Sequence, residues 1–175
     1  CLRGGGPADL RELTVTLVME MLGLGGGADE GHSVRARVEA ALDGGGALER
    51  LARVVARQGG DPQIVLGGAE LPRAPVIRAV RAECGGTVQR VVPERLGYGV
   101  IELGGGRRRV DDTIDPAVGF ELAVEPGLSV AAGELLGFVH ARDEAGADAG
   151  ERALRGACEI EGGAVPLPLP LIMER

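Results

Sequence analysis

The residues most suited to binding an anion are Gly104-Gly105-Gly106-Arg107-Arg108-Arg109, which combine glycine amides with guanidinium groups. This segment lacks the Gly-Lys-Ser/Thr ending of a P-loop and does not fit the dinucleotide-binding fingerprint. It also follows an expected helix, whereas anion sites favour the beginning of one. We therefore interpret it as a helix cap followed by a solvent-exposed arginine turn, with phosphate binding at Arg107, Arg108 and Arg109 as the alternative.

Three aspartates come next, at Asp111, Asp112 and Asp115. Carboxylates bind cations, but this spacing is not that of an EF-hand loop, and no glycine stands where such a loop turns sharply. Asp115 precedes Pro116, which is typical of a turn. We expect turn-forming aspartates rather than a metal site.

The two histidines and a pair of glutamates are the remaining acid–base candidates. His140 ends a predicted strand and could act as a general base, but no Ser, Thr or Cys adjoins it in the sequence as a nucleophile. We expect His140 to be hydrogen-bonded to a nearby carboxylate instead. His32 is expected to precede a helix and to be exposed. Glu121 and Glu125 are expected on the solvated side of their strand.

The three cysteines are Cys1, Cys84 and Cys158, without a Cys-x-x-Cys pair. We expect free and mostly buried thiols. Cys84 lies in an expected turn, but no base or positive helix end is identified beside it, so we expect an inert thiol. The residues alone therefore predict no catalytic, cofactor-binding or metal-binding residue in this chain.

The composition narrows the possible functions. All 19 basic residues are arginine, so no lysine is present to form a Schiff base, carry biotin or lipoate, or bind phosphate. The net charge of −7 disfavours nucleic acid and anionic membranes as partners. The sequence has no apolar run of membrane-spanning length and no charged-then-apolar leader, so we expect a cytoplasmic protein. Because the first residue is Cys1 rather than methionine, we expect a piece of a longer polypeptide.

Helical periodicity dominates the first part of the chain. It predicts helices over residues 10–24, 33–43 and 47–58, each followed by glycines, and a connector over 62–71 with room for one helical turn. The first helix has apolar residues on two sides, so we expect it to be buried on more than one face. Pro72 and Pro75 mark the predicted domain boundary, which gives domains 1–71 and 72–175.

The second part is expected to be rich in strands. Residues 76–83 and 87–92 are predicted to pair as a hairpin through a turn at Gly85-Gly86. Pro93 is well placed to begin a helix, although Gly97 and Gly99 leave a strand open as the alternative. We further predict a half-buried strand over 118–124, a central strand over 135–141, a helix over 145–158 and an edge strand over 165–173.

Two resemblances to known families follow from these segments. The phrase EPGLSVAAGELLGFVHA, at residues 125–141, resembles the hammerhead strands of biotinyl and lipoyl carrier domains. In those domains a hairpin lysine carries the cofactor, and this chain has no lysine. This resemblance therefore implies, at most, a non-catalytic hammerhead binding module.

The longer resemblance covers roughly 150 residues. The segments LGGGRR, DDTIDPAVGF and VHARDE are similar to the C-terminal domain of the thymidine and pyrimidine-nucleoside phosphorylase family, and the first two favour its thymidine phosphorylases. Upstream, DLRELTVTLVMEML, ARVEAALDGG and RVVARQGGD resemble helices that precede this domain. The implied fold class is α+β, with a helical segment of a larger α/β catalytic domain followed by an α/β-hammerhead domain.

The phosphorylase resemblance also implies a function. Its members are cytoplasmic homodimeric glycosyltransferases of pyrimidine metabolism, which catalyse reversible phosphorolysis of thymidine to thymine and 2-deoxyribose 1-phosphate. They need no cofactor beyond the co-substrate phosphate. The family's phosphate-binding and pyrimidine-contacting residues have no matching positions in this sequence, so we expect a structural portion that is inactive alone. We also expect the helical unit to self-associate or to lose order, because its apolar faces at Val15, Val18, Met19 and Leu22 would lack partners.

Overall fold

The computed structural model describes residues 1–25, 31–163 and 170–172. The chain divides into two compact units, Cys1–Glu70 with Pro170–Arg175, and Leu71–Leu169. The described residues contain both helices and antiparallel sheets, so the predicted α+β class is confirmed. None of the described helices has the length and apolar character that crossing a membrane requires.

The first unit is built from helices. They are α1 (Ala8–Leu24), α2 (Gly31–Asp43), α3 (Gly46–Arg57) and the single turn α4 (Pro62–Leu66). The three helices predicted by periodicity are confirmed, although His32 lies inside α2 rather than before it. The Asp61 side chain begins α4 by accepting a 2.8 Å hydrogen bond from the Gln63 amide.

Helices α1 and α2 share a small core. Val15 of α1 packs with Val34, Val38 and Leu42, and Val18 and Met19 lie against this cluster. Ion pairs support the contact: Arg35 of α2 reaches Glu12 at 2.5 Å, and Arg11 of α1 reaches Asp43 at 2.9 Å.

The expected burial of α1 on more than one face is wrong within this chain. Val15 is its one fully buried residue, whereas Met21 and Leu24 are 70% and 88% exposed. The reason is that α2 is the main packing partner of α1 in the described part of the first unit.

The second unit contains two antiparallel sheets. In the first, β5 (Leu135–Ala141) lies between β1 (Val76–Arg81) and β3 (Gly119–Leu122). In the second, β2 (Gly86–Val91) lies between β4 (Ser129–Val130) and β6 (Cys158–Glu161). The central position predicted for residues 135–141 is confirmed.

The predicted hairpin of residues 76–83 with 87–92 is wrong. Strand β1 pairs with β5 from Val76 opposite Ala141, and β2 pairs with β4 and β6. The segment around Gly85 carries the chain from the β1–β5–β3 sheet to the β4–β2–β6 sheet. The helix predicted over 145–158 is confirmed as α6 (Glu144–Ala157), except that Cys158 begins the unpredicted strand β6. The edge strand predicted over 165–173 lies mostly outside the described residues.

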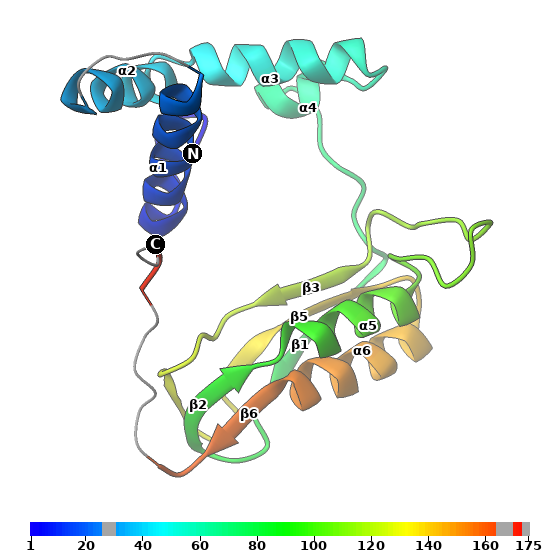
Figure 1. Ribbon diagram of the computed structural model, residues 1–175. Coiled ribbons are helices and arrows are strands. Elements are labelled where there is room, and N and C mark those ends of the chain that lie inside the picture. The colour runs from blue at the N-terminus through cyan, green and yellow to red at the C-terminus, as the bar shows by residue number, and fades with distance from the viewer. Residues whose placement is uncertain (26–30, 164–169, 173–175) are drawn as a thin grey trace. The chain divides into compact units, whose positions relative to one another are not determined.

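Helices α5 (Pro93–Leu103) and α6 (Glu144–Ala157) lie side by side on one face of the β1–β5–β3 sheet (Figure 1). The helix starting at Pro93 is confirmed and the strand alternative is wrong. Gly99 explains why a glycine suits this helix: a Cβ there would lie 3.0 Å from the Ala153 Cβ of α6 and 2.9 Å from the Phe120 ring. The close packing of α5 against α6 therefore requires a residue without a side chain at position 99.

One core joins the helices to both sheets. Its fully buried members include Val80, Val88, Leu136, Val139 and Leu154. The opposite face of the β1–β5–β3 sheet carries Ile77, which is 51% exposed, and the half-buried His140. Helices α5 and α6 thus cover one face of the sheet, whereas the opposite face is accessible to solvent around Ile77 and His140.

Candidate functional site

The glycine–arginine segment leaves the end of α5 as part of a loop that projects from the second unit (Figure 1). Gly104 has a φ of 90°, a left-handed conformation that ends the helix. Its amide donates to Ile101 at 3.1 Å, and the Gly105 amide donates to Val100 at 2.9 Å. These two amides are therefore used in capping α5, as the cap interpretation predicted.

Asp112 occupies the next two amides. Its Oδ2 atom accepts hydrogen bonds from the backbone amides of Arg108 and Arg109, both at 2.9 Å. These bonds, from Arg109 first and then Arg108, hold the pKa of Asp112 below its ordinary value. A carboxylate of the chain thus fills the position in which the arginine amides would otherwise bind a phosphate.

Asp115 forms hydrogen bonds that connect the two ends of the same loop. Its amide donates to the Gly104 carbonyl at 2.9 Å, and its carboxylate accepts bonds from the Ala117 amide at 3.0 Å and from Arg142 at 3.0 and 3.1 Å. The Ala117 amide, followed by Arg142, lowers the pKa of Asp115. This residue therefore has a structural role that its turn-like sequence predicted only in part.

The guanidinium groups of Arg107, Arg108 and Arg109 are the anion-binding groups that remain. All three residues are exposed, and none forms a side-chain hydrogen bond or ion pair with another residue of the described chain. Exposed charges are screened by water and salt, so such a triplet alone gives weak and unspecific anion binding.

The three aspartates do not gather around a cation position. Asp112 and Asp115 are occupied by the bonds above, and Asp111 is exposed. Among the residues that the structure describes, no group of three or more metal-ligating side chains is brought together.

His140 lies beside a carboxylate on the open face of the sheet. Its Nε2 atom is 3.6 Å from the Glu121 Oε2 atom of β3, and its side chain is 27% exposed. Its direct neighbours across the strands are Ile77 and Gly119, neither of which is a nucleophile. The contact fits the expected carboxylate partner better than the general base.

The cysteines are free, but only one of them is buried. Cys158 is buried, and burial raises the pKa of its thiol, whereas Cys84 is exposed and Cys1 is intermediate. The expectation of mostly buried thiols is therefore wrong. Cys84 lies in the connection between β1 and β2, at the surface of the second unit.

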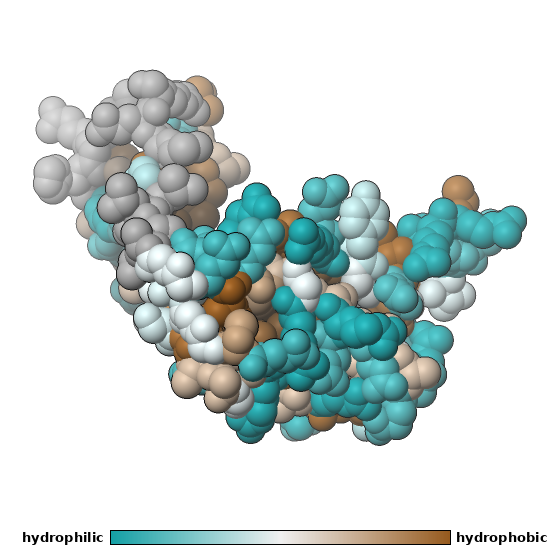
Figure 2. Space-filling view, turned by 90° about the horizontal axis from the view of Figure 1, so that it is seen from below, coloured by the Kyte–Doolittle hydropathy of each residue, from teal (hydrophilic) through white to brown (hydrophobic). Residues whose placement is uncertain are grey.

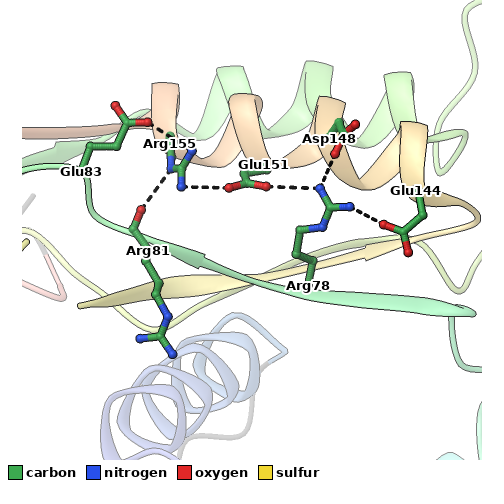
Figure 3. A network of polar contacts seen from close by, with 7 residues as sticks. All are labelled: Arg78, Arg81, Glu83, Glu144, Asp148, Glu151 and Arg155. Carbon is green, nitrogen blue, oxygen red and sulfur yellow. Dashed lines mark hydrogen bonds and ion pairs between the residues drawn. The ribbon is translucent and has the colours of Figure 1, made fainter. Parts of the chain in front are cut away.

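A charged network that the sequence reasoning missed joins β1 to α6 (Figure 3). Arg78 of β1 binds three α6 carboxylates, those of Glu144, Asp148 and Glu151. These contacts, with Asp148 the strongest, raise the pKa of Arg78. The signal available in the sequence was the recurrence of acidic residues on one face of the helix.

Arg155 extends this network along α6. It binds Glu151 at 2.8 Å and Glu83 at 3.2 Å, and its Nε atom donates to the Arg81 carbonyl at 3.0 Å (Figure 3). Every cation and anion in this network has a partner within the chain, so we assign it to holding α6 on the sheet.

Hydrophilic side chains cover most of the second unit when it is viewed from below, and apolar ones gather in a few separate spots (Figure 2).

Comparison with known proteins identifies the relatives of this chain. Residues 87–161 match the family described as the pyrimidine nucleoside phosphorylase C-terminal domain. The chain is 46% identical over 150 residues to the thymidine phosphorylase of Burkholderia cenocepacia strain HI2424, which covers 85% of this chain and 34% of that protein. It is 44% identical over 142 residues to the thymidine phosphorylase of Burkholderia lata, which covers 81% and 32%.

The chain therefore spans about a third of the length of the relatives it matches. The predicted resemblance to a C-terminal portion of thymidine phosphorylases is confirmed, and the comparisons do not favour the carrier-domain alternative.

Proposed function

We propose that this chain is the C-terminal portion of an enzyme that catalyses reversible phosphorolysis of thymidine to thymine and 2-deoxyribose 1-phosphate. The observation that carries the proposal is the similarity to thymidine phosphorylases over 85% of the chain. The reaction transfers a pentosyl group to phosphate, which makes the parent enzyme a glycosyltransferase. Thymidine and phosphate are its proposed substrates, and no cofactor is required.

The chain itself has a structural role in this proposal, and the residues that bind phosphate and nucleoside lie in the part of the parent that the chain does not include. Three observations support this. The sequence has no lysine, the amides of Arg108 and Arg109 are occupied by Asp112, and His140 lies beside Glu121 rather than a nucleophile. Each candidate group is thus already engaged or exposed to water.

We assign residues 1–71 to the helical segment of the parent's α/β domain and residues 72–175 to its α/β-hammerhead domain. The match of residues 87–161 to the family's C-terminal domain supports the second assignment. The parent is proposed to be a cytoplasmic homodimer, as the family resemblance implies.

The test measures thymine released from thymidine and phosphate by the purified 175-residue chain and by the full-length enzyme that carries it. We expect release by the full-length enzyme and none by the chain above a no-protein control. Thymine release by the chain alone would show that a complete site lies within it. Absence of release by a folded full-length enzyme would contradict the assigned reaction.

A matched variant separates the structural role from a hidden phosphate site. In the full-length enzyme, the triple substitution Arg107→Gln, Arg108→Gln and Arg109→Gln should leave the KM for phosphate within about twofold, because exposed guanidinium groups contribute little to binding. A much larger rise of this KM, with kcat unchanged, would assign phosphate binding to the arginine loop.

A further inference from the structure

Helix α1 carries a second apolar stripe that no described residue of the first unit buries. Leu10, Leu17 and Leu24 recur at intervals of seven residues, and Met21 follows Leu17 by one helical turn, so all four lie along one side of the helix. Their exposed fractions are 49%, 54% and 88% for the leucines and 70% for Met21. We call these four residues the seam.

The seam is separate from the face that packs on α2. That face consists of Val15, Val18 and Met19, which belong to or lie against the small α1–α2 core. A groove of about 270 Å³ between α1 and α2 is lined by Val18 and Leu22 and not by any residue of the seam. Helix α1 therefore has two apolar sides, and within the described parts of the chain only the side with Val15 is packed against a partner.

An apolar side of this kind is unfavourable in water. A helix that is apolar on more than one side is normally enclosed by other elements, and contiguous exposed apolar residues mark sites of protein contact. The seam contains no charged side chain, so its partner is apolar rather than acidic or basic. Its recurrence every seven residues suits a second helix packed along it.

We propose that the seam is the docking site for an apolar helix in the part of the full-length enzyme that this chain does not include. This inference rests on the proposed function, since it takes the chain to be one portion of a longer phosphorylase. The relatives extend well beyond it, because the matched region makes up only 34% of their length. That remainder supplies the surface that the first unit lacks.

The test places the same substitutions in two contexts. The double variant Leu17→Gln/Met21→Gln is made in the 175-residue chain and in the full-length enzyme, with Glu20→Gln, an exposed α1 residue outside the seam, as the matched control. Glutamine keeps the helix propensity close to that of leucine and methionine, so helix formation itself is little changed. The midpoint of thermal unfolding is measured in dilute solution, together with hydrogen exchange of the α1 amides.

In the isolated chain we expect the double variant to unfold at the same midpoint as the control, because both seam side chains are exposed there. In the full-length enzyme we expect a lower midpoint and faster exchange of the α1 amides, because the covered seam receives two buried polar groups. An unchanged full-length enzyme would overturn the proposal.

A lowered midpoint in the isolated chain would also overturn it. A lowering that depends on protein concentration would assign the seam to a second copy, and one that does not would assign it to another part of the same chain. The proposed function is checked separately, because the wild-type full-length enzyme must still release thymine whatever the midpoints show.

Discussion

Replacing Gly99 by alanine should loosen α5 from α6, whereas the same replacement at Gly97 should stabilise the chain. Both glycines lie inside α5, where alanine is favoured over glycine by about 0.8–1 kcal/mol. A Cβ at Gly97 would meet no atom within 4 Å, so Gly97→Ala should gain most of this amount. The two variants share the same change in helix propensity.

The two positions differ in the space available for a new Cβ atom. At Gly99 the new Cβ would lie 3.0 Å from the Ala153 Cβ and 2.9 Å from the Phe120 Cζ, where carbon atoms normally rest about 3.5–4.0 Å apart. Overpacking of this kind costs about 1–3 kcal/mol. After the gain in propensity, Gly99→Ala should be destabilised by about 0–2 kcal/mol, and the gap between the two variants should be about 1–3 kcal/mol.

The assay is urea unfolding of the 175-residue chain followed by far-UV circular dichroism, with hydrogen exchange of the α5 and α6 amides to assign the change to the second unit. Faster exchange in both helices of Gly99→Ala, and slower exchange in α5 of Gly97→Ala, is the expected pattern. Equal stability of the two variants would refute the argument that Gly99 serves close packing.

Three further predictions follow from the polar contacts and the thiols. The folded state lowers the pKa of Asp115 below its ordinary 3.8, so its contribution to stability is present above pH 3.8 and is lost as the pH falls below that value through the lower pKa of the folded state. The urea midpoint of Asp115→Asn should therefore fall less on acidification than that of the wild type, and equal falls would contradict the Arg142 and amide contacts. Arg78→Met leaves the α6 carboxylates without their shared cation, so added salt should raise its unfolding midpoint by screening their repulsion. An unchanged salt response would show that Arg78 does not hold α6. A thiol reagent followed by mass spectrometry should label the exposed Cys84 rapidly and Cys158 only as the chain unfolds, whereas equal rates would refute the burial of Cys158.

Local patterns in the sequence predicted the helices well. Apolar residues at helical spacing, each run followed by glycine, led to α1, α2 and α3, and the both-sided apolar run of 135–141 led to the central strand β5. The glycines of α5 made a strand possible as an alternative prediction for this segment. The contact that requires glycine at position 99 is with Ala153 of α6, which is distant in the sequence. A close approach between two helices leaves no local signal.

Strand pairing could not be predicted from local signals. The glycines after Cys84 favoured a hairpin between β1 and β2, but each strand found its partners much later in the chain, at β5 and β6. The four-residue β6 follows α6 directly and is too short for a period to be recognised. The choice of partner depends on which side-chain faces can share one core, and periodicity does not contain that information.

The candidate site was predicted in part. The turn-forming role of the aspartates is confirmed for Asp112 and Asp115 by their bonds to backbone amides. The link from Asp115 to Arg142 was not predicted, because it joins residues on different segments. Arg78 was missed for the same reason: its three partners lie on a helix well beyond it in the sequence.

The pairing of β1 with β5 also affects how the second unit folds while it is being synthesised. The register joins Val76 to Ala141 and Val91 to Cys158, so β1 and most of β2 have no partner until segments about 65 residues further along have been made. Pairing between such distant segments is slow, because a long loop must close before any contact forms. Until then β1 and β2 present unpaired edges, which are sites for association with other nascent chains. If synthesis stopped between α5 and β5, the product would therefore contain β1 and β2 without the strands β5 and β6 that complete the two sheets.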